Sequence, residues 1–201
     1  MDAEGFLAES ARRVDAQLAR DLEGAQAPPA LLAAMRHLIF PGGKRLRPAV
    51  VFAACRAAGG PLDAALGSAA AVELLHTYSL IHDDLPCMDD DRLRRGRPTV
   101  HIAHGEALAV LAGDALQALA FETLARSEGW AGLGGVAELA RAAGASQLVG
   151  GQADDLAFAG AAEGAALADE IASIHRRKTA ALFAASAALG ARSAGAPRDL
   201  R

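Results

Sequence analysis

The chain has 201 residues, of which 52% are hydrophobic and 22% are charged, and its net charge is −4. This composition can bury a sizeable core, which excludes disorder of the whole chain, and a slightly acidic chain is unlike a typical nucleic-acid-binding protein. Its two cysteines, Cys55 and Cys87, cannot form a disulfide scaffold. The N-terminus lacks a secretory h-region and no apolar run reaches about 18 residues, so we expect no membrane span and a cytoplasmic location.

The composition favours an all-α fold. Alanine, which has the highest intrinsic helix propensity, is abundant, whereas β-branched and aromatic residues are sparse. We therefore expect residues 1–201 to form a single all-α domain, a helical bundle. In chain order, apolar periodicity and Gly or Pro stops predict a first helix that ends near residue 23 and further helices over 28–40, 48–58, 62–85, 106–126, 136–150 and 168–189. Loops are expected at 94–98 and 158–164, and a bend at 150–151.

The strongest chemical signal is the acidic segment at residues 83–91, which reads DDLPCMDDD. Like charges at this density repel one another and a helix C-terminus disfavours anions, so we expect a divalent cation to offset the repulsion. Carboxylate ligands without cysteine favour Mg²⁺. In a straight helix Asp83 and Asp89 would point about 120° apart, but Pro86 distorts that turn and lets both carboxylates reach one cavity. A solvated acidic loop is the alternative interpretation.

Two basic segments flank these acids. Residues 42–48 read GGKRLRP and contain Lys44, Arg45 and Arg47, and residues 92–98 read RLRRGRP. Arginine binds phosphate through a forked pair of hydrogen bonds, and lysine acts as a compact positive charge. Two basic segments beside one acidic segment suggest two anionic ligands, one of them held through a metal. The alternative for residues 42–48 is a turn with a solvated positive face. The alternative for residues 94–98 is a basic loop that only neutralises the neighbouring acids.

Five segments carry a family resemblance, in order GGKRLRP, HTYSLIHDDLPCMDDDRLRRGRPTVH, GEALAVLAGDALQALAFE, GGQADDL and HRRKTAAL. From Leu31 to Gly190 the chain resembles the trans-isoprenyl diphosphate synthases, and especially the bacterial farnesyl diphosphate synthases. The resemblance implies an isoprenoid-synthase-type all-α bundle around a deep central cavity, usually a homodimer. It implies a Mg²⁺-dependent prenyltransferase that condenses dimethylallyl or geranyl diphosphate with isopentenyl diphosphate to give farnesyl diphosphate.

The resemblance also implies roles for individual residues. The first aspartate-rich motif, with the metal ligands, is Asp83, Asp84 and Asp89, and Asp83 and Asp89 are its main Mg²⁺ ligands. Asp83, Asp89 and Lys178 are the expected catalytic residues. The expected substrate-binding residues are Gly43, Lys44, Arg47, His76, Arg94, Arg95, Gln152, Asp155, Lys178 and Thr179. Of these, Lys44, Arg47, His76 and Arg95 are expected to hold isopentenyl diphosphate, and Arg94 the allylic diphosphate.

Tyr78 and Ser79 are the expected determinants of product length. Tyr78 lies five residues before Asp83, slightly more than one helical turn from the expected metal site. The growing hydrocarbon is expected to extend along this helix, and a bulky ring would stop it at a C15 product. A C20 product, geranylgeranyl diphosphate, is the alternative, and simple packing of Tyr78 between helices is another.

Two other functions stay open. His37, His82, Asp83 and His101 are candidate ligands of an HD-type metal phosphohydrolase, although that function leaves both basic segments unexplained. Relatives of the resembled family carry a second aspartate-rich motif after the KT pair, and this sequence ends at Arg201 before one occurs. We therefore expect either a part of a longer gene product without the C-terminal helices, or a non-catalytic homologue that acts as a binding or dimer partner.

Overall fold

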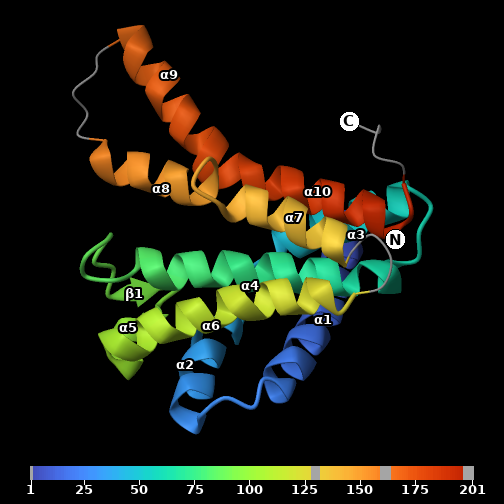
Figure 1. Cartoon of the computed structure of the whole chain (residues 1–201), viewed down its shortest axis with the longest axis horizontal. Helices are drawn as coiled ribbons and strands as arrows, with labels where there is room; N and C mark the ends of the chain where they lie inside the picture. Colours follow the sequence, from blue (N-terminus) through green and yellow to red (C-terminus); the bar gives the residue numbers. More distant parts are fainter. Residues whose placement is uncertain (1, 128–131, 159–163, 197–201) are drawn as a thin grey trace.

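The computed structural model describes residues 2–127, 132–158 and 164–196 (Figure 1). Their helices are α1 (Ala3–Gly24), α2 (Pro29–Ile39), α3 (Leu46–Ala57), α4 (Leu66–Asp83), α5 (Val100–His104), α6 (Glu106–Ala125), α7 (Leu133–Ala143), α8 (Leu148–Ala157), α9 (Gly164–His175) and α10 (Ala181–Ser193). A 3₁₀ turn, Leu62–Ala65, precedes α4, and a π-helical turn, Arg176–Ala180, joins α9 to α10. The strands β1 (Leu93–Arg94) and β2 (Arg97–Pro98) form a short antiparallel hairpin. The all-α prediction is confirmed.

Local sequence signals explain how several helices begin. The side chain of Asp2 accepts a hydrogen bond from the Gly5 N–H at 2.8 Å and so caps α1. Pro29 occupies the first turn of α2, where its missing N–H costs nothing. Helix α3 begins at Leu46 rather than after Pro48, because proline is equally tolerated within that first turn.

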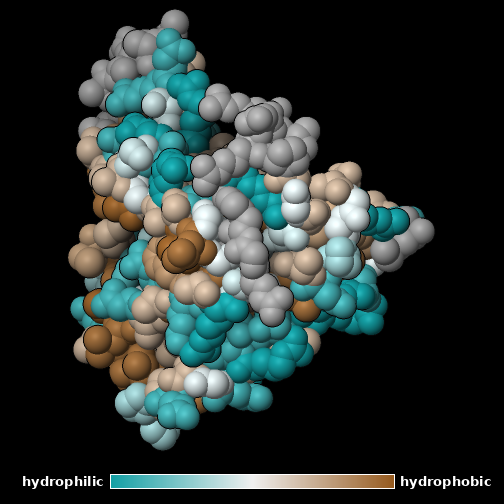
Figure 2. Space-filling model, turned by 45° about the vertical axis from the view of Figure 1, so that its right-hand side comes forward, coloured by the Kyte–Doolittle hydropathy of each residue, from teal (hydrophilic) through white to brown (hydrophobic). Residues whose placement is uncertain are grey.

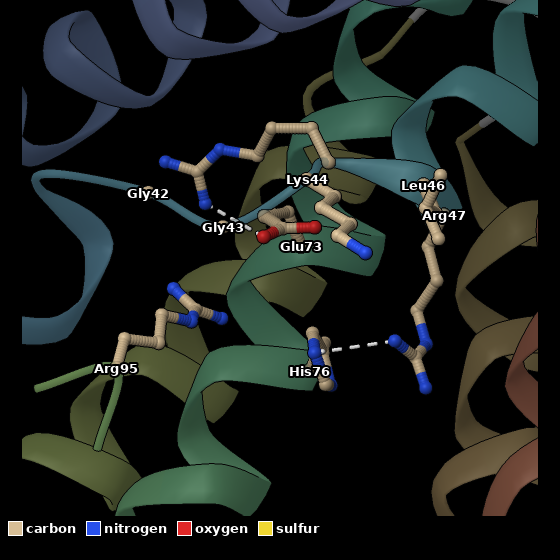
Figure 3. Close-up of a pocket in the computed structure, with 9 residues that line it drawn as sticks. Gly42, Gly43, Lys44, Leu46, Arg47, Glu73, His76 and Arg95 are labelled. Atoms are coloured by element: carbon tan, nitrogen blue, oxygen red, sulfur yellow. Dashed lines mark hydrogen bonds and ion pairs between the residues drawn. The ribbon is translucent and has the colours of Figure 1, made fainter. Parts of the chain in front are cut away.

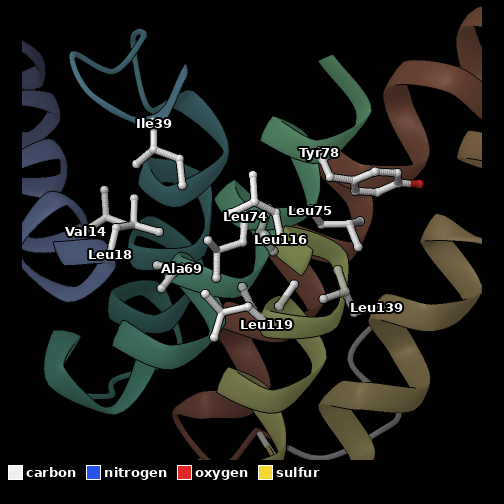
Figure 4. Close-up of a cluster of buried hydrophobic side chains, with 14 of the residues drawn as sticks. Val14, Leu18, Ile39, Ala69, Leu74, Leu75, Tyr78, Leu116, Leu119 and Leu139 are labelled. Atoms are coloured by element: carbon white, nitrogen blue, oxygen red, sulfur yellow. The ribbon is translucent and has the colours of Figure 1, made fainter. Parts of the chain in front are cut away.

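The core forms where α4 and α6 run side by side through the centre of the bundle (Figure 1). Figure 4 shows Leu74 and Leu75 of α4 close to Leu116 and Leu119 of α6, and all four side chains are buried. Alanine fills α4 at residues 69–71 and is completely buried there. Small side chains let neighbouring helices approach closely, which explains how an alanine-rich sequence packs a dense core.

Helix α10 packs closely against α3 at a glycine. A Cβ atom added to Gly190 would lie 2.0 Å from the carbonyl oxygen of Val51, a distance that no side chain can tolerate. Because the neighbour is backbone rather than a flexible side chain, any larger residue would push the two helices apart. Gly190 was expected to end the last helix, whereas the structure continues α10 to Ser193.

The structure corrects two helix predictions beside α4. The helix expected over 136–150 is divided, because α7 ends at Ala143 and α8 begins at Leu148. Gly151 does not form the expected bend but lies within α8, where an added Cβ would come 2.4 Å from the backbone nitrogen of Lys178. The last helix is interrupted by the π-helical turn that contains Lys178. Of the loop expected at 158–164, residues 159–163 lie outside the described residues.

Two segments reach the length and mean hydropathy of a membrane span, although neither is an uninterrupted apolar run of the kind sought in the sequence. These are Leu62–Asp83, with a mean hydropathy of 1.2, and Glu106–Ala125, with 1.4. Within the fold, 67% of the first window and 44% of the second are buried. Central helices of a bundle pass the same test, so these segments are weak evidence for a membrane. Apolar side chains also gather along the left edge of the face shown in Figure 2.

Candidate active site

A cavity of about 550 Å³ opens between the segment before α3, the middle of α4 and the β1–β2 hairpin. Figure 3 shows Lys44, Arg47, His76 and Arg95 placed around this opening. Gly43 also lines it, so the structure brings these five predicted substrate-binding residues together. Because three of the five carry a positive charge, this cationic cavity is suited to an anionic ligand.

Arg47 and His76 are in polar contact in the cationic cavity. Arg47 Nη1 lies 3.2 Å from His76 Nε2, and the Arg47 guanidinium stacks at 4.6 Å over the ring of Phe183 on α10. Burial, reinforced by Arg47, lowers the pKa of His76 to about 3. His76 is therefore neutral at pH 7 and accepts the hydrogen bond, while the buried Nε of Arg47 keeps a donor without a partner among the described residues.

A second, smaller cavity of about 130 Å³ continues from this point towards the C-terminal end of α4. His76, Ser79 and Asp83 lie on one face of α4 and line it. Gln152 of α8 and Lys178 of the π-helical turn line the opposite side, together with Thr179. Gln152 is only 8% exposed, and neither its side-chain nitrogen nor its side-chain oxygen has a partner among the described residues. This connecting cavity therefore offers unpaired polar atoms to a ligand.

Asp83 is the central carboxylate of the connecting cavity. Burial raises its pKa to about 6; Lys178 opposes that rise and the nearby Asp89 carboxylate adds to it. The chain after α4 folds back, so that the Asp89 N–H donates to the Asp83 carbonyl oxygen at 2.9 Å. Lys178 Nζ lies 2.5 Å from Asp155 Oδ2. The interruption after α4 thus brings the backbone of Asp89 back to that of Asp83. Asp89 does not line the connecting cavity, so a shared site for the two carboxylates stays a prediction.

Asp84 and Arg94 are placed differently from the prediction. The Asp84 side chain is completely buried, and its Oδ1 accepts a hydrogen bond from Arg94 Nε at 2.7 Å. Neither residue lines the cavity that holds Asp83, and Arg94 instead borders a hollow of about 160 Å³ beside Arg95. The Asp84 carboxylate therefore neutralises Arg94 within the protein, which differs from its expected place among the metal ligands with Asp83 and Asp89. Among the described residues no three acidic, histidine or cysteine side chains form a metal-ligand group.

The third cavity, of about 260 Å³, is mostly apolar and adjoins the connecting cavity. The two share Ser79, Asp83, Leu148 and Gln152. Tyr78 lines this apolar cavity, and its ring meets the ring of His82 edge to face at 5.6 Å. The remaining wall consists of Met88, Val149, Ala153 and Leu156. The three cavities thus lead from a cationic end, past Asp83, to an apolar end at Tyr78.

Sequence reasoning missed several of these lining residues. Glu73 lines the cationic cavity one helical turn before His76, and helical periodicity alone could have identified it. Phe183 and Leu148 carry no local signal, because their part in the site depends on how α10 and α8 pack.

The four candidate ligands of a phosphohydrolase do not meet. His37 Nε2 lies 2.8 Å from the Pro98 carbonyl oxygen, whereas His82 Nε2 lies 3.0 Å from that of Val110. His101 is buried and pairs with Thr99. The histidines thus serve packing between helices and the hairpin, which argues against that function.

Comparisons with known proteins agree with this arrangement. Residues 28–201 match the polyprenyl synthetase family. The chain is 48% identical over 170 residues to the chloroplastic geranylgeranyl pyrophosphate synthase of Capsicum annuum, covering 82% of this chain and 45% of that protein. It is also 48% identical over 172 residues to large subunit 1 of a chloroplastic heterodimeric geranylgeranyl pyrophosphate synthase of Arabidopsis thaliana. That match covers 83% of this chain and 46% of that protein.

A solved structure shares the fold. The FPP/GFPP synthase of Zymomonas mobilis superposes with a TM-score of 0.88 at 41% identity, covering 98% of this chain and 73% of that one. The chain spans about half the length of the curated relatives it matches. The family match, the identities and the shared fold together establish that this chain belongs to the polyprenyl synthetase family.

Proposed function

We propose that this chain provides the substrate-binding cavities of a trans-prenyltransferase, which joins an allylic diphosphate to isopentenyl diphosphate. The observation that carries the proposal is the sequence of three adjoining cavities, cationic at one end, acidic in the middle and apolar at the other. Two diphosphates and one hydrocarbon chain require these three environments. The names of the relatives, which are prenyl diphosphate synthases, support the same reaction class.

Isopentenyl diphosphate would bind in the cationic cavity. Lys44, Arg47 and Arg95 would neutralise its charge, and Arg47 offers an unpaired Nε–H there. A neutral His76 keeps the Arg47 guanidinium oriented without adding a charge of its own. Guanidinium groups suit this task because their fork matches two phosphate oxygens.

The allylic diphosphate would bind beside Asp83 with Mg²⁺. The oxygen donors of Asp83 and Asp89 suit Mg²⁺, which keeps several waters and commonly binds through one or two carboxylates and substrate phosphates. Bound there, Mg²⁺ would supply Lewis-acid stabilisation of the charge on the departing diphosphate. Lys178, held by Asp155, and the unpaired amide of Gln152 would contact the same diphosphate.

The reaction needs charge stabilisation and exclusion of water rather than a protein nucleophile. The allylic C–O bond breaks, pyrophosphate leaves with the electron pair, and the isopentenyl double bond attacks the carbocation. The proton lost from the new cation goes to the departing pyrophosphate. Tyr78, Leu148 and Leu156 would keep water from the carbocation, and Lys178 would neutralise the charge on the leaving group.

We propose farnesyl diphosphate as the product. Tyr78 is 5% exposed and lines the apolar cavity, where its ring would stop the chain after three isoprene units. Geranylgeranyl diphosphate is the alternative product, because the curated relatives described above are named as geranylgeranyl pyrophosphate synthases.

We also propose a homodimer that uses the outer face of α5 and α6. Ile102, Val110 and Leu111 are 40%, 41% and 52% exposed, and three large apolar side chains on adjoining helices favour burial against a second copy. A heterodimer is the alternative, because one relative is named as a subunit of a heterodimeric synthase.

The reaction is tested by incubating the chain with Mg²⁺, isopentenyl diphosphate and dimethylallyl, geranyl or farnesyl diphosphate in turn, and separating the products by chromatography. We expect longer prenyl diphosphates from the wild type and from the surface variant Arg56→Ala, and far less product from Arg47→Ala at the same substrate concentrations. If the folded chain binds both diphosphates without condensing them, the cavities are substrate sites and this chain alone does not carry out the condensation. If it binds neither, the proposal is wrong.

A further inference from the structure

Arg45 lies in the same basic segment as Lys44 and Arg47, but its charge is used inside the protein. Its side chain is 1% exposed. Its Nε donates to Asp15 Oδ1 at 2.9 Å and its Nη1 to Glu73 Oε1 at 2.6 Å. Its Nη2 donates to the carbonyl oxygen of Ile39 at 2.6 Å. These contacts leave the guanidinium with no donor directed into solvent.

The three partners of Arg45 belong to three different helices. Asp15 lies in α1, Glu73 in α4, and Ile39 is the last residue of α2. Arg45 itself stands immediately before α3 with a left-handed backbone, φ 49°. One buried side chain therefore joins the first four helices at the point where the chain turns into the cationic cavity.

The backbone of this turn is shaped around the Arg45 side chain. A Cβ atom added to Gly42 would lie 2.2 Å from the Arg45 guanidinium carbon, so a side chain at residue 42 would displace the guanidinium from its present position. Lys44 precedes Arg45 and Arg47 follows two residues later, and both line the cationic cavity. The direction of these two cations thus depends on where Arg45 is held.

We propose that Arg45 is a positioning residue for anion binding, and that Asp15, which lies outside the cavity, supports the binding of a diphosphate through it. This inference rests on the proposed function of the cationic cavity. It assigns no direct phosphate contact to Arg45, although a basic residue in this motif would ordinarily be taken as a ligand.

The proposal and simple electrostatics predict opposite signs for one substitution. Asp15→Asn removes a negative charge near a cationic cavity, so electrostatics alone predicts tighter anion binding. If Asp15 holds Arg45, the same substitution loosens the turn and weakens binding. We expect the dissociation constant for inorganic pyrophosphate to rise about tenfold. A loss of that size is typical when a metal ligand loses the hydrogen-bond partner that orients it.

The test is calorimetric titration of the full chain with inorganic pyrophosphate. Asp63→Asn is the matched control, because Asp63 also pairs with an arginine, Arg13, but on the surface away from the cavity. The double variant of Asp15→Asn with Arg45→Lys should bind no more weakly than Arg45→Lys alone, since both act through one contact. Arg45→Lys retains the charge but loses the forked geometry, and we expect it to weaken binding in a protein whose thermal unfolding remains cooperative.

The outcomes separate this inference from the proposed function. Weaker binding by Asp15→Asn and Arg45→Lys, with unchanged binding by Asp63→Asn, supports the positioning role. Wild-type affinity or tighter binding in Asp15→Asn overturns it, with Arg47→Ala, which should bind pyrophosphate far more weakly, as the check that binding occurs in the cationic cavity. If the wild type itself binds no pyrophosphate, the cationic cavity is not a diphosphate site and both proposals fail.

Discussion

Replacing Arg47 by lysine separates the charge of the cationic cavity from its geometry. Lysine keeps the positive charge but loses the forked donors and the stacking on Phe183. A charge-assisted hydrogen bond contributes about 1.5–3 kcal/mol, and a cation–π contact about 0.5–1 kcal/mol. Lysine should retain part of the hydrogen-bond contribution. We therefore expect Arg47→Lys to weaken the binding of isopentenyl diphosphate about tenfold, and Arg47→Ala to weaken it about a hundredfold.

The assay is calorimetric titration with isopentenyl diphosphate and, separately, with a non-hydrolysable allylic diphosphate analogue. Arg56→Lys is the control, because Arg56 is exposed in the last turn of the same helix. The allylic analogue should lose much less affinity than isopentenyl diphosphate. Equal losses for the two ligands would mean that the two diphosphate sites are reversed, and unchanged binding in both variants would refute the role of Arg47.

Three further predictions concern product length, packing and pH. Tyr78→Ala should shift the product from C15 towards C20 and beyond, as separated by chromatography. An unchanged C15 product would mean that a residue other than Tyr78 stops the growing hydrocarbon chain. Gly190→Ala should lower the free energy of unfolding by about 2 kcal/mol relative to the control variant Gly24→Ala, as measured in denaturant titrations. The reason is that the new Cβ would lie 2.0 Å from the Val51 carbonyl oxygen, whereas the space around Gly24 is open. Equal free energies of unfolding in the two variants would refute that contact. His76 has a pKa of about 3 when folded against 6.5 ordinarily, so the unfolded chain binds the extra proton and the wild type should lose about 2 kcal/mol between about pH 7.5 and pH 5. His76→Gln should lose correspondingly less over that range, and a parallel loss would show that His76 is not responsible.

Helix positions were predictable where proline or glycine marks an end. The limits of α2 and α6 agree with the sequence to within about two residues. The break between α7 and α8 was not predictable, because the glycines that suggested a bend at 150–151 serve close packing instead, Gly150 against the Ala145 carbonyl oxygen and Gly151 against the backbone of Lys178. The π-helical turn likewise has no local signal. Its Lys178 and Arg177 pair with Asp155 and Asp154 of α8, contacts that the sequence alone does not reveal.

The composition of the site was predictable, but the use of each charge was not. The motifs identified Lys44, Arg47 and Asp83, which the structure places in adjoining cavities. They could not show that Arg45 pairs with Glu73 and Asp15, which lie 28 and 30 residues away in the sequence. Nor could they show that the Asp84 carboxylate pairs with Arg94 inside the protein. Such pairing is decided by tertiary contacts. A charged motif therefore predicts that a binding site is present more reliably than it predicts which of its residues contact the bound ligand.

Mg²⁺-dependent binding at Asp83 is the most direct test of the proposed reaction. The measurement is calorimetric titration of a non-hydrolysable allylic diphosphate analogue, with Mg²⁺ and after chelation, using Asp83→Asn and the exposed neighbour Asp90→Asn as a matched pair. The account predicts that chelation abolishes binding, that Asp83→Asn weakens it about tenfold or more, and that Asp90→Asn leaves it unchanged. Equal affinity with and without Mg²⁺, or full affinity in Asp83→Asn, would contradict it.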